Sequence, residues 1–477
     1  MNKDSSKPKK APKRGEKISL TIDSTAFKGK GIGRFKGMAI FVPNTAPGDL
    51  VEAQVTKRKK SFCEARLIEV IEPSEHRIEP KCRHAKQCGG CTWQHLPYEK
   101  QLEIKSRQVM DHMERIGGFS DITKRPTLPA ENSFYYRNKM DYSFGNRRWL
   151  SREEIERDKY VSDRGIWCGL HAPGRFDKIL NLKECHLQKP ISYDILDTVR
   201  SYARENNIPA FDTIENTGYL RNLGIRTSHY TDDLMVNFVT FFNDEELMSE
   251  ISDALLDEFP QITTIINNVN DRKNPTAIGR YEKVVYGPGY ITDYIKPFSF
   301  KIHANAFFQT HTPQAELLYE KAVELAELDH PELVYDLYCG VGTLSLVLSR
   351  HAKKVVGIEA NEVAVENARQ NTDANNVDNV SFIKGDMKEK LTGKLIEQFG
   401  KPESVFTDPP RAGMHPDVVQ TLNRFGAPKI IYISCNSSTM ARDLKALSGR
   451  YHIEAIQPVD MFPQTYHIET IAALKRK

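Results

Sequence analysis

The sequence lacks any long hydrophobic run. Nothing in its 477 residues approaches the ~18–20 consecutive apolar residues of a membrane-spanning helix, and the first residues have no apolar segment of the kind that a signal peptide carries. A membrane protein and a secreted protein are therefore both disfavoured, and we expect a cytoplasmic protein. The net charge is also small, +4 at pH 7, so overall charge does not indicate a nucleic-acid partner.

Cysteine is sparse, with eight residues in the chain, but it is unevenly distributed. In a long chain without a secretion signal, a few cysteines favour metal binding or catalysis over a disulfide framework. Cys82, Cys88 and Cys91 form a tight C-x5-C-x2-C cluster. Three thiols this close indicate a zinc or an iron–sulfur site, and either site usually needs a fourth ligand. Cys168 and Cys185 are the candidates for that ligand.

The length of the chain suggests about three domains. Residues 1–14 form a basic, proline-containing tail that is predicted to be disordered. Between 15 and 73, short alternating apolar runs are separated by turn-rich segments, which predicts a small β-barrel. The tail and the block 57–60 are basic enough to contact phosphates, although a solvated tail and a solvated turn would have the same composition.

Residues 74–297 are predicted to form a middle domain. The cysteine cluster is followed by an amphipathic helix, predicted over 98–119, and we expect this helix to pack on the C-terminal domain. In the strand-rich region that follows, aromatic residues alternate with basic ones such as Arg137 and Lys139. This pattern suits base stacking and phosphate binding. It also fits aromatic residues that face a core while the basic residues face water.

Residues 298–477 alternate between apolar strands and helical segments, which implies a parallel, doubly wound sheet. A glycine turn, Asp336-Leu-Tyr-Cys-Gly-Val-Gly342, follows an apolar strand and opens a helix. Glu359 lies about twenty residues further on, the spacing at which a carboxylate accepts ribose hydroxyls in dinucleotide-type folds. The turn is not a nicotinamide fingerprint, because Ser345 stands where the third glycine of that motif would be.

The strand predicted at 429–434 leads directly to Cys435. The thiol is therefore expected at the carboxyl end of a strand, where open α/β sheets bind their ligands. A lone cysteine is by default a small core residue. Two acidic residues change that expectation: Asp408 follows the preceding strand, in Asp408-Pro-Pro-Arg411, and Glu469 lies in a polar break near the end of the chain. Cys435 is thus a candidate nucleophile.

These motifs resemble the RNA uracil-C5 (5-methyluridine) methyltransferase family, in particular its 23S rRNA type with a TRAM domain and an iron–sulfur cluster. The glycine turn resembles the S-adenosylmethionine loop of class I methyltransferases. Three further segments resemble the family in the same order along the chain, and the N-terminal turns resemble the TRAM domain, an OB-like barrel. The three family segments are Asp408-Pro-Pro-Arg-Ala-Gly413, Ser434-Cys-Asn436, and Met461-Phe-Pro together with Glu469. The turns that resemble the TRAM domain are Gly29-Lys-Gly-Ile-Gly33, 47–49 and 57–60.

The resemblance implies an α/β class I (Rossmann-like) methyltransferase domain, an N-terminal OB-like β-barrel and a strand-rich α+β middle domain. It implies methyl transfer from S-adenosyl-L-methionine to C5 of a uridine in RNA, 23S rRNA or alternatively tRNA, by a monomer. The site residues that it implies are Cys435 and Glu469 for catalysis; Gln309, Tyr338, Glu359, Asp386 and Asp408 for the cofactor; and Cys82, Cys88, Cys91 and Cys185 for an iron–sulfur cluster of the 4Fe-4S type.

The chemistry explains why such an enzyme needs a thiol and a base. C5 of uracil is a poor nucleophile, and a thiolate that adds to C6 turns the ring into an enolate whose C5 can attack a methyl group. Cys435 would need a lowered pKa or a neighbouring base, and Glu469 would remove the C5 proton. An amino-group methyltransferase is disfavoured because Arg411 stands where its motif has an aromatic residue. A non-catalytic RNA-binding factor would need neither Cys435 nor Glu469.

Overall fold

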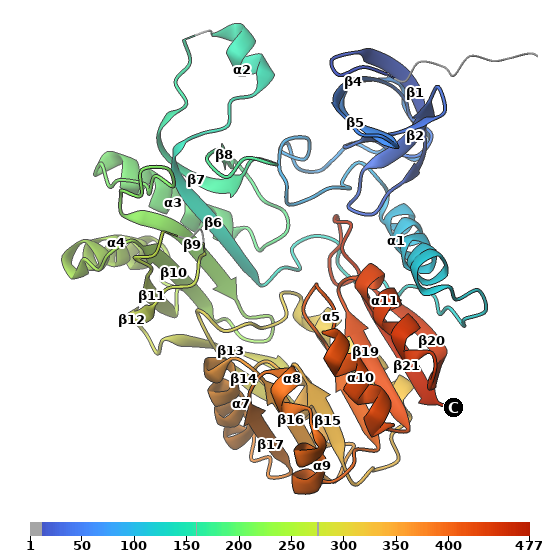
Figure 1. Cartoon of the computed structure of the whole chain (residues 1–477). Coiled ribbons are helices and arrows are strands. Elements are labelled where there is room, and N and C mark those ends of the chain that lie inside the picture. Colours follow the sequence, from blue (N-terminus) through green and yellow to red (C-terminus); the bar gives the residue numbers. More distant parts are fainter. Residues whose placement is uncertain (1–11, 159, 274–275) are drawn as a thin grey trace, which may run out of the picture.

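The structure is a computed structural model that describes residues 12–158, 160–273 and 276–477. Most of the tail predicted to be disordered, residues 1–11, lies outside this range. Along the chain, a barrel is followed by a domain built on a mixed sheet and then by a C-terminal domain built on a second sheet (Figure 1). No helix in the described part of the chain is long and apolar enough to cross a membrane.

Five strands close the N-terminal barrel in the order β1-β2-β3-β5-β4. Alternate residues of β1, such as Ile18, Leu20 and Ile22, are buried and pack on Val51 and other residues across the barrel. This alternation is the pattern that predicted the barrel, which is confirmed. The strands are β1 (Lys17–Thr25), β2 (Gly31–Phe35), β3 (Met38–Val42), β4 (Leu50–Arg58) and β5 (Phe62–Glu72).

The cysteine cluster lies in an irregular segment between β5 and α1 (Tyr98–His112). This helix begins where the sequence predicts it, changes into a π-helical turn η1 (Met113–Gly117), and ends before Gly118, whose φ is 79°. Glycine adopts this left-handed conformation without steric cost. The predicted helix therefore ends at Gly117, two residues earlier than expected.

A seven-stranded sheet forms the middle domain, in the order β12-β11-β10-β9-β6-β7-β8. One face packs on α3 and α4 through residues such as Tyr142, Leu223 and Phe238. The strands are β6 (Lys139–Arg147), β7 (Arg164–His171), β8 (Ile179–Asn181), β9 (Leu220–Thr227), β10 (Leu234–Thr240), β11 (Thr264–Val269) and β12 (Tyr281–Tyr286); the helices are α2 (Arg152–Arg157), α3 (Ile191–Glu205) and α4 (Glu245–Glu258).

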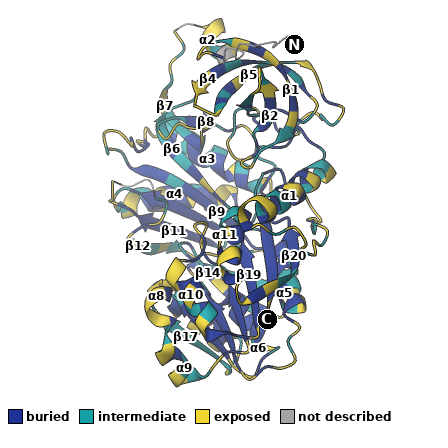
Figure 2. Ribbon diagram, turned by 45° about the vertical axis from the view of Figure 1, so that its right-hand side comes forward, coloured by how far each residue is buried: buried dark blue, intermediate teal, exposed yellow. Residues whose placement is uncertain are grey.

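The C-terminal sheet has the order β17-β16-β15-β18-β19-β21-β20. The chain runs outward from β15 to β17 and then returns to the other side at β18, so the strand order reverses between β15 and β18. Figure 2 shows the strands buried and the helices exposed on their outer faces. The strands are β15 (Val334–Leu337), β16 (Val355–Glu359), β17 (Val380–Lys384), β18 (Ser404–Thr407), β19 (Lys429–Ser434), β20 (Tyr451–Val459) and β21 (Glu469–Arg476).

Helices flank this sheet, and a hairpin precedes it. The hairpin consists of β13 (Tyr290–Ile295) and β14 (Phe298–His303), and it leads into α5. The parallel pairing of β15 to β19 confirms the doubly wound sheet expected from the alternating pattern. The helices are α5 (Thr312–Ala326), α6 (Thr343–Ser349), α7 (Glu362–Ala374), α8 (Met387–Lys390), α9 (Gly393–Phe399), α10 (Pro416–Phe425) and α11 (Ser437–Leu447).

A buried ion pair joins α1 to the loop between β20 and β21. Lys105 Nζ lies 2.6 Å from Asp460 Oδ1, and both side chains are fully buried. The Tyr98 hydroxyl donates to the other carboxylate oxygen at 3.0 Å. Nearby, the side chain of Gln101 donates to and accepts from Gln464, at 3.0 and 2.9 Å. These contacts fix the loop against a helix that lies more than 350 residues away in sequence.

We expect Lys105→Met to lower the free energy of unfolding by about 3 kcal/mol, because it leaves the buried Asp460 carboxylate without its counter-ion. Lys100→Met on the same helix is the matched control. Its ion pair with Glu103 is partly exposed, so the expected change is within about 0.5 kcal/mol. Urea unfolding of both variants measures the difference, and equal losses would contradict a special role for the buried pair.

Candidate active site

The residues implied for catalysis meet at the carboxyl edge of the C-terminal sheet. Leu337 pairs with Thr407, and Thr407 pairs with Tyr432, so the residues that follow β15, β18 and β19 lie at one edge. Tyr338, Asp408 and Cys435 occupy these positions. In open α/β sheets this edge, at the point where the strand order reverses, is the ligand-binding position.

Glu469 reaches the same edge because β21 runs antiparallel to β19. Ser434, which precedes Cys435, pairs with Thr470, which follows Glu469. The first residue of β21 therefore lies beside the residue that follows β19. This juxtaposition is a property of the sheet topology, since 34 positions separate Cys435 from Glu469 in the sequence.

The environment of Cys435 keeps its thiol protonated in the free protein. The pKa of Cys435 is raised to about 11, first by burial and then by the nearby carboxyls of Glu469 and Asp408, while the Arg411 guanidinium acts in the opposite direction. Arg411 also lies within hydrogen-bonding reach of the thiol. The site thus does not lower the thiol pKa by itself. It supplies instead a cation that can stabilise a thiolate and two carboxyl groups that can accept a proton.

Both of these carboxyl groups are themselves perturbed. Burial raises the pKa of Asp408 to about 7. The pKa of Glu469 is raised well above its usual range, first by burial and then by Asp408, with Arg411 acting in the opposite direction. Glu469 is only 5% exposed. Perturbed carboxyls that lie beside a thiol at a sheet edge are the arrangement expected of acid–base catalysis.

The glycine turn and Glu359 form a cradle beside this cluster. The Glu359 carboxylate accepts hydrogen bonds from the backbone N–H of Gly340 at 3.2 Å and of Asn361 at 2.8 Å. Tyr338, Gly340 and Gly342 all have positive φ, so the turn curls away from the sheet. An open turn beside a fixed carboxylate fits a nucleoside whose ribose hydroxyls bind the acid.

Ser345 has a structural reason to replace glycine in this turn. Its hydroxyl donates to the Asp336 carboxylate at 2.5 Å. Asp336 is 1% exposed, and burial raises its pKa to about 7, an effect that the Ser345 hydrogen bond opposes. The buried carboxyl would lose this donor if glycine stood at position 345.

The other two cofactor candidates have different neighbours. Asp386 is exposed and caps α8, with its carboxylate accepting from the backbone N–H of Lys388 at 2.8 Å. Burial raises the pKa of Tyr338 to about 12, and Asp386 and Glu359 contribute, so the three side chains are neighbours. Gln309 is buried within hydrogen-bonding reach of the Tyr319 hydroxyl, and Tyr319 is also an electrostatic neighbour of Asp408.

Sequence reasoning did not assign a role to Arg411 or to His467. Arg411 follows Asp408-Pro-Pro, and its backbone carbonyl accepts from the Asn436 side chain at 2.9 Å, which ties the two motifs together. Burial lowers the pKa of His467 to about 4, and Arg411 contributes, so this imidazole is neutral beside the guanidinium. The position of Arg411 directly after Asp408-Pro-Pro could have indicated a role in the site, whereas no sequence pattern marks His467.

The four cysteines implied as cluster ligands gather in the middle domain without converging on one point. Burial raises the pKa of Cys91 to about 12, and Cys88, Cys185 and Cys82 contribute to the shift. Cys168 is instead the neighbour of Arg200 and Arg204, so Cys185 is the fourth thiol of the group. Among the described residues, however, no three His, Cys, Asp or Glu side chains are arranged to hold a metal ion.

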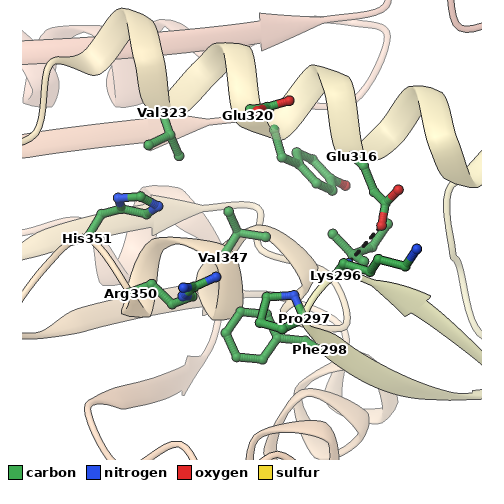
Figure 3. Close-up of a pocket in the computed structure, with 11 residues that line it drawn as sticks. Lys296, Pro297, Phe298, Glu316, Glu320, Val323, Val347, Arg350 and His351 are labelled. Carbon is green, nitrogen blue, oxygen red and sulfur yellow. Dashed lines mark hydrogen bonds between the residues drawn. The ribbon is translucent and has the colours of Figure 1, made fainter.

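A cleft of about 390 Å³ lies away from this edge, between α5, α6 and the turn of the β13–β14 hairpin (Figure 3). Lys296, Glu316 and His351 line it, and none of the implied catalytic or cofactor residues does. Tyr319 lines it as well, and its hydroxyl lies 3.3 Å from Thr343 Oγ1 at the start of α6. The cleft therefore lies behind the cofactor cradle and not in it.

A doubly wound sheet with a glycine turn and a carboxylate at its carboxyl edge is an arrangement that class I, S-adenosylmethionine-dependent methyltransferases share with dinucleotide-binding enzymes, and the comparisons with known proteins decide between the two. The family model described as tRNA (Uracil-5-)-methyltransferase matches residues 234–477, and the TRAM domain model matches residues 12–68. The chain belongs to the RNA uracil-5 methyltransferase family and carries its TRAM domain.

Relatives match over nearly the whole chain. An uncharacterized RNA methyltransferase of Chlorobaculum tepidum is 42% identical over 97% of this chain and 97% of its own, and one of Bacteroides thetaiotaomicron is 41% identical over 94% and 99%. The solved structure of Pyrococcus abyssi tRNA (uracil-54, C5)-methyltransferase in complex with S-adenosyl-L-homocysteine is similar with a TM-score of 0.74 and 30% identity, covering 96% of this chain and 99% of that one.

The glycine turn gives a prediction about stability. In Gly342→Ala the new Cβ would lie 2.9 Å from Phe382 and 3.1 Å from Ala368, at a φ of 81°. Left-handed strain of about 1–2 kcal/mol and overpacking of about 1–3 kcal/mol should both lower the free energy of unfolding. Gly340→Ala is the control, because its φ is 57° and its Cβ meets nothing within 4 Å. Equal losses in thermal unfolding would contradict the packing argument.

Proposed function

We propose that this protein methylates C5 of a uridine in RNA through a covalent bond between Cys435 Sγ and C6 of the base. The observation that carries the proposal is the cluster of Cys435, Arg411 and Glu469 at one sheet edge, with Asp408 beside it. Family membership supports the same chemistry. The division into an RNA-binding barrel at 15–73, a middle domain at 74–297 and a catalytic domain at 298–477 is part of the proposal.

In this proposal the resting thiol loses its proton only when substrate is bound. Asp408, whose pKa is raised to about 7, is the nearby group suited to accept that proton near neutral pH. Arg411 stabilises the thiolate and then the negative charge that develops on the ring. A neutral site that becomes charged on reaction avoids the cost of keeping a thiolate buried before substrate arrives.

Glu469 is the proposed base for the C5 proton. Once ionised, a carboxylate with a raised pKa is a stronger base than a solvated one, and burial supplies that raised pKa here. After proton removal the bond between Sγ and C6 breaks, and the thiolate returns to its place beside Arg411. S-adenosylmethionine, when bound, supplies the methyl group as an electrophilic sulfonium.

The cofactor cradle is proposed to use five side chains. Glu359 would accept the ribose hydroxyls, because the backbone N–H groups of Gly340 and Asn361 hold its carboxylate in place. Tyr338 and Asp386 would lie on the adenine side, and Gln309 on the side of the thiol. Asp408 would contact either the donor or the uracil edge, since it is an electrostatic neighbour of both Cys435 and Tyr319.

We expect covalent trapping to test this mechanism. With S-adenosylmethionine and total RNA substituted with 5-fluorouridine, the protein should form an adduct that survives denaturation, because fluorine cannot leave C5 as a proton does. Cys435→Ala should form none. Cys63→Ser, which changes a buried thiol of the N-terminal barrel, should still form it. Glu469→Gln should accumulate an adduct on unsubstituted RNA, because the C5 proton stays in place.

The absence of an adduct in the wild type would favour an amino-group methyltransferase or a non-catalytic RNA-binding factor.

The RNA recovered from the adduct also identifies the substrate. We propose 23S rRNA, because a TRAM barrel and a cysteine cluster occur together in this chain. Recovery of tRNA, the substrate named for the Pyrococcus abyssi relative, would contradict that part alone. We also propose that the protein is a cytoplasmic monomer. A cytoplasmic location fits an RNA substrate, and it fits eight cysteines that form no disulfide.

We also propose that Cys82, Cys88, Cys91 and Cys185 hold an iron–sulfur cluster, of the 4Fe-4S type. The chemistry of the donor set suits the cluster, because four cysteines are the usual ligands and the four thiols are electrostatic neighbours. Binding would have to draw together thiols that the described structure does not arrange around one point. A bound cluster would tie the segment before α1 to the middle sheet, and metal binding supplies folding free energy directly.

Protein purified without oxygen should show broad visible absorbance and about four irons per chain. Cys185→Ser should lose both signals. Cys168→Ser should keep them, because this buried thiol lies beside arginines and not beside the other four cysteines. Colourless protein that holds stoichiometric zinc would contradict the iron–sulfur proposal.

A further inference from the structure

A groove of about 360 Å³ lies between the barrel and α1. One wall is the turn that joins β1 to β2, with Thr25 and Phe27, and the other is the face of α1 with Ile104 and Gln108. The volume lies within the range of about 300–1,000 Å³ that is typical of small-ligand sites. The functional-site residues described above do not line this groove, which we call the barrel–helix groove.

Packing and hydrogen bonds hold the shape of the barrel–helix groove. The Gln108 side chain donates to the Ala26 carbonyl at 3.0 Å, and the Trp93 indole donates to the Gly29 carbonyl at 3.3 Å. A Cβ at Gly29 would lie 3.1 Å from that indole nitrogen. The turn is therefore fixed against α1 and the neighbouring segment, and the groove is formed before any ligand arrives.

The lining suits a flat, partly polar ring. Phe27 is 37% exposed and touches His112 edge-on, with 5.0 Å between ring centroids. Ile104 adds an apolar surface on the opposite wall. Arg107 and Arg115 also line the groove and are mostly exposed, and each forms an exposed ion pair with a carboxylate of α1, Glu103 at 3.3 Å and Asp111 at 3.8 Å.

The groove is connected to the candidate active site. His112 Nδ1 lies 2.8 Å from Ser437 Oγ, and Ser437 is two residues beyond Cys435. Phe27 also lies edge-on to Tyr466, with 6.1 Å between centroids, and Tyr466 lies against His467 at 4.1 Å. His467 is the imidazole beside Arg411. Aromatic side chains thus lead from the groove to the thiol.

We propose that the barrel–helix groove holds one nucleobase of the RNA segment that flanks the target uridine, stacked on Phe27. The inference rests on the proposed function for the class of its ligand. An enzyme that extrudes a base leaves its neighbours unstacked, and proteins bind such bases on aromatic side chains with base edges hydrogen-bonded. Arg107 and Arg115 can reach the phosphates on either side of the base, because their ion pairs with Glu103 and Asp111 are exposed and therefore weak.

Photo-cross-linking locates this base without requiring methyl transfer. The full-length protein is irradiated with a pool of single-stranded 12-nucleotide RNAs that contain 4-thiouridine, and the linked peptides are identified by mass spectrometry. Cross-links on the β1–β2 turn or on the groove face of α1 are expected. Cross-links confined to other surfaces would overturn the proposal, as would blocking of the groove by a protein partner that RNA does not displace.

Fluorescence anisotropy with the same RNA pool tests the stacking contact. Phe27→Ala should weaken binding about tenfold, which is within the range for loss of one stacking partner. Phe176→Ala, an exposed phenylalanine of the middle domain, is the control and should leave the affinity unchanged. Wild-type affinity in Phe27→Ala would overturn the proposal.

The outcomes separate this inference from the proposed function. Groove cross-links without a 5-fluorouridine adduct would leave the base site standing and remove the methyl-transfer mechanism. An adduct in the wild type, combined with unchanged RNA affinity in Phe27→Ala and no groove cross-links, would remove only the base site.

Discussion

The buried ion pair between Lys105 and Asp460 is the interaction on which the catalytic arrangement depends. It holds the loop between β20 and β21 against α1 at a place where neither charge reaches solvent. The same loop is held by Gln101 and by the backbone N–H groups of Thr92 and Trp93, which donate to Gln464 O at 2.9 and 3.1 Å. Because β21 begins where this loop ends, the position of Glu469 depends on residues near the cysteine cluster.

The segment that carries the clustered cysteines also supports this loop. Cys91 directly precedes Thr92, so the segment that carries the thiols also carries hydrogen bonds to the loop of the base. Tyr136 adds a contact from the middle domain, donating to Pro463 O at 3.0 Å. A bound cluster would therefore stiffen the wall of the active site without taking part in the reaction.

The electrostatics of the site follow from burial. Burial raises the pKa of Cys435, Asp408 and Glu469 alike, and Arg411 is the group that opposes the shift at the thiol and at Glu469. Burial thus favours the uncharged forms of these groups, which suits entry of an uncharged base, and in the proposed mechanism Arg411 stabilises the negative charge that develops on the ring. The barrel turn extends this site outward, because Phe27 and Tyr466 continue the wall beyond His467.

The sequence by itself determined the barrel, the doubly wound sheet, the family and the identity of the candidate thiol, because alternation, glycine turns and strand ends are local patterns. It named Cys435 and Glu469 but could not place them side by side, since that contact requires β21 to run antiparallel to β19. The family resemblance had named Cys185, and not Cys168, with the three clustered cysteines, whereas only the tertiary structure placed Arg411 at the thiol and formed the groove beside Phe27. Each of these features joins segments that are distant in sequence, and no periodic pattern records such contacts.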